Sequence, residues 1–123
     1  MRVFLATLAV FSCGLLIVAR ADAHHSFAMF DADKKTTLTG EVIQVSWTNP
    51  HIWVYLQVVD DKTKKPVTWA FEAAGPRVME GQGWKRNSLK QGDKATVVFH
   101  PLRSGKTGGS LLEASVNGKV IGK

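Results

Sequence analysis

The chain has 123 residues, which is enough for one domain and no more. It carries 16 Lys and Arg against 10 Asp and Glu, a formal net charge of +6, and a single cysteine. One cysteine excludes an internal disulfide framework and any metal site built from several thiolates.

The first 23 residues have the pattern of a cleavable secretory signal. Met1-Arg2 supplies a positive start, 3–18 is almost wholly apolar, and Ala21-Asp22-Ala23 places small residues at the positions that a signal peptidase reads. The apolar run is shorter than the about 20 residues that span a bilayer, so we predict cleavage after residue 23 and no transmembrane helix in the mature form. Two alternatives stay open, a retained membrane anchor and lipidation of Cys13, although the bulky Phe11 fits a lipidation signal poorly.

Cleavage would leave residues 24–123, a segment of 100 residues without cysteine. Removing Arg2, Arg20 and Asp22 leaves 14 basic and 9 acidic side chains, so the mature net charge is +5. This charge favours a small anionic ligand, an acidic protein partner or an anionic membrane surface. Without cysteine, the mature form has no thiol nucleophile and no thiolate metal ligand.

Residues 24–35 follow neither a helical nor a strand period, yet they contain Phe27, Met29 and Phe30. A polar tail would not carry three large apolar side chains. We therefore predict an extended N-terminal arm that packs onto the domain.

Alternating apolar residues predict strands over 36–47, 51–59, 67–73, 94–100 and 110–116. In the first strand the apolar phase shifts between Val42 and Val45, which is typical of a β-bulge. Between the third and fourth strands, Pro76 suits the first turn of a helix of at most about two turns.

Three strands, a short helix and two strands, with a bulged first strand, predict a five-stranded OB-like barrel over residues 36–123. A small β-meander or sandwich is the alternative. In an OB barrel the loops between strands one and two and between strands four and five form the usual ligand site. His51 ends the first loop, and His100 begins the second, which also carries Arg103 and Lys106. The first strand is expected to start at the opposite end, so the arm would have to fold back to reach this site.

The candidate metal ligands are the four histidines, His24, His25, His51 and His100. After cleavage His24 becomes the N-terminal residue, and its α-amino group and ring can hold a metal together. An imidazole from His51 or His100 would complete a nitrogen-rich site of the kind that Cu(II) prefers. The sequence leaves the cofactor open, with copper as the first candidate metal and zinc as the alternative. A simpler explanation also stays open, in which these histidines are only solvated or hydrogen-bonded.

Trp53, Tyr55, Trp69 and Phe71 lie on the second and third strands, the surface on which OB-folds stack bases or sugars. Export removes the protein from most nucleic acid, and Trp69 and Phe71 suit the barrel core, so nucleic-acid binding is disfavoured. No serine lies in a nucleophile-elbow context, and no glycine pattern matches a dinucleotide or phosphate loop. We therefore assign no catalytic residue.

Three segments, 24–31 (HHSFAMFD), 47–51 (WTNPH) and 100–103 (HPLR), resemble a family of small exported bacterial proteins of unknown function. The resemblance covers essentially the whole mature chain. It implies a periplasmic location in a Gram-negative bacterium and a compact β-barrel, but no established activity. The signature positions that it implies are His24, His25, Asn49, His51, His100 and Arg103.

The leading hypothesis is a periplasmic binding module for a small ligand or a copper-type metal. Its expected ligand-binding residues are Asn49, His51, Trp53, His100 and Arg103, and its expected metal ligands are the four histidines. The alternative is a non-catalytic accessory subunit of a periplasmic oxidoreductase or export system, which would bind its protein partner through the aromatic surface of the second and third strands. A metal-dependent oxidative enzyme is a third and weaker hypothesis.

Overall fold

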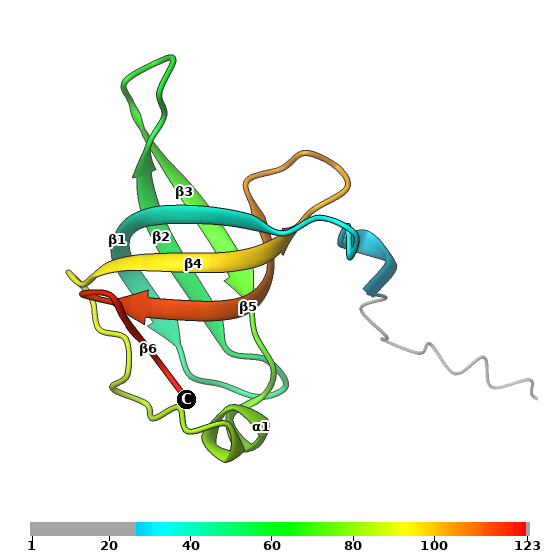
Figure 1. Ribbon diagram of the computed structural model, residues 1–123, viewed down its shortest axis with the longest axis vertical. Coiled ribbons are helices and arrows are strands. Elements are labelled where there is room, and N and C mark those ends of the chain that lie inside the picture. The colour runs from blue at the N-terminus through cyan, green and yellow to red at the C-terminus, as the bar shows by residue number, and fades with distance from the viewer. Residues whose placement is uncertain (1–26, 123) are drawn as a thin grey trace, which may run out of the picture.

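The computed structural model describes residues 27–122 and shows a small barrel of strands with one α-helix at its end (Figure 1). In chain order the elements are a 3₁₀ turn η1 (Phe27–Met29), β1 (Thr36–Ser46), β2 (Trp53–Val59), β3 (Pro66–Glu72), α1 (Pro76–Gly81), β4 (Lys94–Pro101), β5 (Gly108–Val116) and β6 (Lys119–Val120). The predicted order of strands and helix is confirmed, and the two-residue β6 is an addition. The predicted signal, His24 and His25 lie outside the described residues. From residue 27 to residue 122, no helix has the length and apolar character needed to span a membrane.

Backbone pairing closes five of the strands into a cylinder. β1 pairs with β2 and β4, β2 pairs with β3, and β4 pairs with β5, all antiparallel. A parallel pairing of β3 with β5 joins the two remaining edges, which confirms the predicted OB-like barrel. The register of β1 against β2 shifts between Val42 and Gln44, so the predicted bulge is present and helps this strand curl from β4 towards β2.

One face of each barrel strand fills the interior. Phe71 and Phe99 are fully buried, with ring centroids 4.8 Å apart. Trp69 packs against them at 6.2 Å and 5.8 Å. Trp69 and Phe71 therefore belong to the core, as the sequence favoured, and not to an exposed stacking surface. The fully buried aliphatic side chains are Val42, Ile52, Val54, Leu56 and Val97.

Helix α1 covers one end of the barrel and fixes the β1–β2 loop. Gly75 precedes the helix in an extended conformation, and Pro76 occupies the first turn. A Cβ atom at position 75 would lie 2.6 Å from the carbonyl oxygen of Pro50. Only glycine therefore lets the loop lie directly against the start of the helix, and this contact holds the segment that leads into His51.

The arm leaves the barrel beside the β4–β5 loop. Thr36 at the start of β1 pairs with Phe99 near the end of β4. The expectation that β1 begins at the end opposite this loop is therefore wrong, because antiparallel neighbours place the start of one strand beside the end of the other. Phe30 and Leu102 form a further antiparallel bridge, so the arm reaches the loop without folding back.

Candidate functional site

One row of outward-pointing side chains crosses all five barrel strands. Its members, paired in register from strand to strand, are Ser46, Trp53, Glu72, Ser110 and His100. Residues paired across strands point to the same face of the sheet, and their neighbours Phe71 and Phe99 point inward to the core. We call these five residues the outer row. It places two predicted ligand residues, Trp53 and His100, on the outer surface of the barrel, on strands that do not pair with each other.

His51 lies over the outer row, beside Glu72. Two backbone hydrogen bonds, from Ile52 N–H to the Ala74 carbonyl (3.1 Å) and from Ala73 N–H to the Ile52 carbonyl (2.8 Å), continue the β2–β3 ladder beyond the strand ends. His51 Nδ1 lies 2.7 Å from Glu72 Oε1, and the side chains are 33% and 9% exposed. The ring nitrogen donates to the carboxylate, so Nε2 carries the lone pair whenever the ring is neutral.

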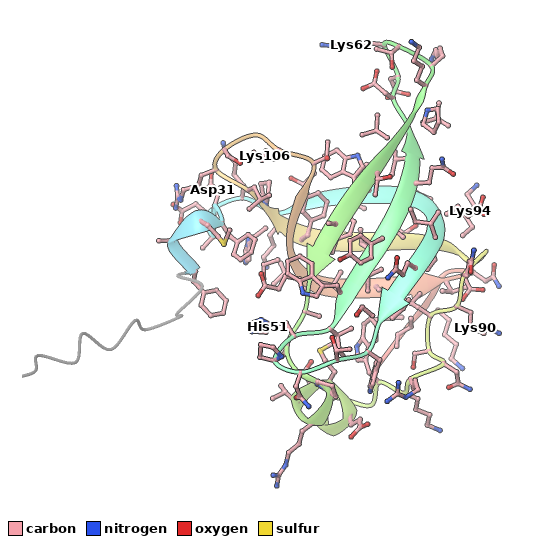
Figure 2. All side chains as sticks on the ribbon, turned by 180° about the vertical axis from the view of Figure 1, so that it is seen from behind. Asp31, His51, Lys62, Lys90, Lys94 and Lys106 are labelled. Atoms are coloured by element: carbon pink, nitrogen blue, oxygen red, sulfur yellow. The ribbon has the colours of Figure 1, made fainter. Side chains whose placement is uncertain are left out.

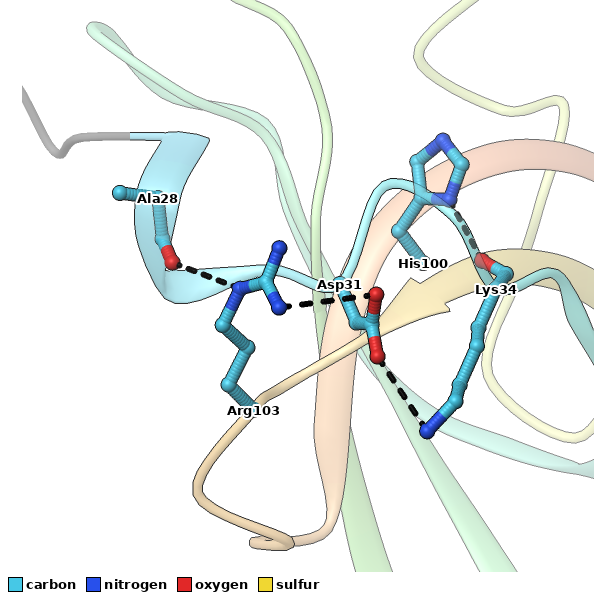
Figure 3. Close-up of polar contacts among 5 residues, drawn as sticks. All are labelled: Ala28, Asp31, Lys34, His100 and Arg103. Carbon is cyan, nitrogen blue, oxygen red and sulfur yellow. Dashed lines mark hydrogen bonds and ion pairs between the residues drawn. The ribbon is translucent and has the colours of Figure 1, made fainter.

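His100 is turned towards the arm. Its Nδ1 lies 2.6 Å from the carbonyl oxygen of Lys34 (Figure 3). A carbonyl only accepts, so Nδ1 donates and Nε2 again carries the lone pair of the neutral ring. Both Glu72 and His100 pair with Ser110, from β3 and β4 respectively. Adjacent strands are roughly 4.8 Å apart, so about 10 Å separates Glu72 from His100 across the sheet.

Arg103 in the β4–β5 loop fastens the arm to the barrel. Its Nε donates to the Ala28 carbonyl at 3.1 Å, its backbone N–H donates to the Met29 carbonyl at 2.9 Å, and its Nη1 lies 3.7 Å from Asp31 Oδ1. Figure 3 shows this arrangement, with Lys34 on the other side of the Asp31 carboxylate. Arg103 was predicted to bind a ligand, and the structure places it in a contact between two segments of the chain.

The Asp31 carboxylate lies between two cations of this anchor. Asp31 Oδ2 is 3.3 Å from Lys34 Nζ, and the Asp31 backbone N–H donates to the Pro101 carbonyl at 2.8 Å. Burial alone would raise the pKa of this carboxyl. The hydrogen bond and positive charge of Lys34, together with the charge of Arg103, outweigh burial and keep the pKa below the ordinary 3.8. The anchor is therefore complete only when Asp31 is ionised.

A pocket of about 430 Å³ opens between the arm, α1 and the adjoining ends of β3 and β5. Its lining residues are Phe27, Phe30, His51, Glu72, Ala73, Ala74, Gly75, Val78, Ser110, Leu111 and Leu112. We call this cavity the arm pocket. Most of its lining is apolar, and among the described residues the polar side chains that line it are His51, Glu72 and Ser110. Concave sites of this volume, with an apolar lining and a few convergent polar groups, are typical of small-molecule binding.

The structure brings together only part of the predicted site. His51 lines the arm pocket, whereas Asn49, Trp53, His100 and Arg103 do not. Asn49 is exposed in the β1–β2 loop, and Trp53 stacks on Tyr55 outside the barrel at 6.4 Å between ring centroids. Figure 2 shows His51 beside α1 and Lys106 of the β4–β5 loop towards the other end of the barrel. The two loops therefore do not form one continuous site, and the ligand roles of these residues stay predictions.

The proposed copper ligands are similarly divided. His51 and His100 have different partners, and His24 and His25 lie outside the described residues. Residues 27–122 contain no group of three His, Cys, Asp or Glu side chains placed to hold a metal. A copper site would therefore require His24 or His25.

Sequence reasoning missed Glu72 and the two arm phenylalanines of the arm pocket. Glu72 is the only acidic residue in the otherwise apolar or neutral strand Pro66–Glu72. A carboxylate at the end of such a strand, next to the expected loop site, was the available signal. Phe27 and Phe30 were recognised as packing residues of the arm, but nothing in the sequence indicated which surface they would contact.

Comparison with family models shows a match to DUF6152, a family of unknown function, over residues 14–112. The match covers most of the chain, so the chain belongs to this family. A comparison with curated proteins finds no match. The family agrees with the resemblance to proteins of unknown function; the signature residues and the exported location stay predictions.

Proposed function

We propose that the mature chain is a periplasmic, non-catalytic binding module whose small ligand occupies the arm pocket. The observation that carries this proposal is the His51–Glu72 pair, 2.7 Å apart, in the wall of an otherwise mostly apolar cavity. Apolar walls supply affinity by desolvation, and a few fixed polar groups orient the ligand. Both groups are held by β-sheet pairing or its extension, so this wall is organised before a ligand arrives.

The proposal is tested by ¹H–¹⁵N NMR of the processed protein with benzyl alcohol, benzylamine and benzoate as probes. At least one probe should shift the backbone amides of the arm pocket, including Ala74 and Leu111. Ser110→Phe should abolish these shifts by filling the cavity. Ser115→Phe is the matched control, because Ser115 also lies on β5 but outside the pocket lining. The proposal fails if no probe moves the pocket amides, or if both variants respond like the natural protein.

A copper-type metal is the second candidate, and the anchoring of the two histidines favours it. Metal-binding histidines commonly donate their other ring nitrogen to a carboxylate or a backbone carbonyl, which orients the ring. His51 Nδ1 contacts a carboxylate and His100 Nδ1 contacts a carbonyl oxygen. The N-terminal His24 would supply its amino group and ring, and His25 a further imidazole.

Electron paramagnetic resonance of the processed protein during a Cu(II) titration tests this second candidate. We expect one stoichiometric nitrogen-rich signal that is altered in His51→Ala or His100→Ala. One additional residue before His24 should weaken binding if the α-amino group is a ligand. Absence of stoichiometric binding, or spectra unchanged in both histidine variants, would exclude the composite site.

A further inference from the structure

We infer that the arm pocket selects a small organic cation, an amine with an apolar body, through the carboxylate of Glu72. This inference deepens the proposed function and rests on it. It runs against the expectation from net charge, because a chain with more basic than acidic residues favours anions at long range.

The described residues that line the arm pocket carry no excess of positive charge. Among residues 27–122, the only ionisable side chains that line it are His51 and Glu72, and no lysine or arginine of this range does so. With a neutral imidazole the pair carries one negative charge, and with a protonated imidazole it is neutral. The ionised pair therefore never presents a net positive charge, so the described lining offers an anionic ligand no excess of cations.

The Glu72 carboxylate can accept a further hydrogen bond. Glu72 Oε1 accepts from His51, and within residues 27–122 no second hydrogen bond reaches the Glu72 side chain. In the same part of the chain no buried side-chain oxygen or nitrogen lacks a hydrogen-bond partner. Glu72 Oε2 must therefore reach solvent, although the side chain is only 9% exposed. Because Glu72 lines the arm pocket, its remaining oxygen offers an acceptor to a donor that enters there.

Apolar side chains form most of the remaining lining of the arm pocket. Phe27 and Phe30 contribute aromatic rings from the arm, and Val78, Leu111 and Leu112 contribute aliphatic surface. Aromatic faces attract cations more than neutral or anionic groups. A carboxylate shielded from water beside such walls attracts an ammonium group more strongly than one on an open surface. The combination fits a positively charged head on an apolar body.

The basic side chains that dominate the net charge lie elsewhere. Figure 2 shows the labelled Lys62, Lys90, Lys94 and Lys106 away from His51. Lys34 and Arg103 are engaged with Asp31 in the arm anchor. Anions are therefore expected to associate loosely with the outer surface and cations to enter the pocket.

Three probes of similar shape and different charge test the selectivity: benzylamine, benzyl alcohol and benzoate, with a chelator present to remove metal ions. Dissociation constants are measured from the amide shifts of the arm pocket in the processed protein. We expect benzylamine to bind about tenfold more tightly than benzyl alcohol, and benzoate to bind most weakly. Glu72→Gln should remove most of this preference, while Glu41→Gln, the same charge change at an exposed position on β1, should retain it.

Phe27→Leu gives a second variant that does not depend on the buried pair. Phe27 is 82% exposed, so the fold should tolerate the change. The benzylamine affinity should fall by about threefold and the benzyl alcohol affinity should barely change. Binding of benzoate or benzyl alcohol as tight as that of benzylamine overturns the inference, as does a full amine preference in Glu72→Gln. If no probe moves the pocket amides, the proposed function itself fails; if neutral probes bind and the amine gains nothing, only this inference fails.

Discussion

The two walls of the arm pocket are held in place by different means. Glu72 and Ser110 belong to β3 and β5, whose backbone pairing also closes the barrel around the core. Phe27 and Phe30 belong to the arm, which is held by a few backbone hydrogen bonds and the side chain of Arg103. The first wall can be lost only when the barrel opens, whereas the second can detach from an intact barrel. The polar groups of the arm pocket are therefore fixed by the barrel itself, whereas its phenylalanine rings can be lost while the barrel stays folded.

The largest effect should come from the core behind the barrel wall. Phe99→Ala removes a fully buried ring that lies 4.8 Å from Phe71, and should lower the free energy of unfolding by about 3–5 kcal/mol. Urea denaturation followed by tryptophan fluorescence measures this loss. The wall formed by β3 and β5 should be lost together with the rest of the barrel in one cooperative transition. A separate, earlier transition of β3 and β5 would contradict the view that one wall is inseparable from the fold.

Truncating a phenylalanine of the arm should lower the free energy of unfolding less than truncating Phe99, and the barrel should stay folded. Phe30 is 7% exposed, and Phe30→Ala should lower the free energy of unfolding by about 2 kcal/mol, less than a central core truncation because the arm can rearrange. Phe27→Ala is the matched control, since that ring is 82% exposed and its loss should change the stability by less than about 0.5 kcal/mol. Equal losses of stability in the two variants, measured by urea denaturation, would mean that burial of Phe30 does not hold the arm on the barrel.

Removing the Arg103 side chain should loosen the arm alone. Arg103→Ala deletes its hydrogen bond to the Ala28 carbonyl and its ion pair with Asp31, and should weaken arm docking by about 1 kcal/mol. Hydrogen exchange of the Asp31 amide, which donates to Pro101, should accelerate about fivefold. Lys106→Ala in the same loop should leave this rate unchanged. Undiminished protection of the Asp31 amide in Arg103→Ala would assign the anchoring to the backbone contacts.

Acid should give the smallest effect, again on the arm. The pKa of Asp31 in the folded chain lies below its ordinary 3.8, so ionised Asp31 stabilises the docked arm above that pH. This contribution is lost as the pH falls through the lowered pKa. Carboxyl NMR shifts between about pH 2 and pH 6 measure the titration.

The Asp31→Asn variant should lack this pH dependence of arm docking. Asp60 in the β2–β3 loop is an internal control, because its pKa is lowered chiefly by hydrogen bonds from Thr63 within the loop. The titration of Asp60 should be the same in Arg103→Ala and in the natural chain, whereas the pKa of Asp31 should rise towards its ordinary value. If the titration of Asp31 is unchanged in Arg103→Ala, the charge of Arg103 does not contribute to the lowered pKa of Asp31.

The barrel could be predicted from sequence because each strand shows its own alternation of inward and outward residues. Alternation along β2 separates inward Val54 and Leu56 from outward Trp53 and Tyr55, and a phase shift within β1 marks the bulge. The arm pocket could not be predicted in this way. The contact between His51 and Glu72 depends on how the β1–β2 loop continues the ladder beyond β2 and β3, and the proximity of Glu72 to Ser110 depends on the parallel pairing that closes the barrel.

The placement of the arm shows the same limit. Its apolar residues indicated that it packs somewhere, but only the pairing of Thr36 with Phe99 places its exit beside the β4–β5 loop. The anchor at Arg103 then follows from that exit and not from any motif. His51 was recognised as a candidate, whereas its carboxylate partner required the three-dimensional register.

The seam between β3 and β5 consists of three paired positions, Ala70 with Gly108, Phe71 with Gly109 and Glu72 with Ser110. A Cβ atom at position 108 would lie 2.5 Å from the Ala70 carbonyl oxygen. A side chain at this position would therefore clash with β3 and push the two strands apart. A ligand that contacts both Glu72 and Ser110 would link β3 to β5 across this short pairing. Its binding should therefore raise the melting temperature of the whole domain in proportion to the logarithm of its concentration, which gives a thermal-shift assay for finding the natural ligand.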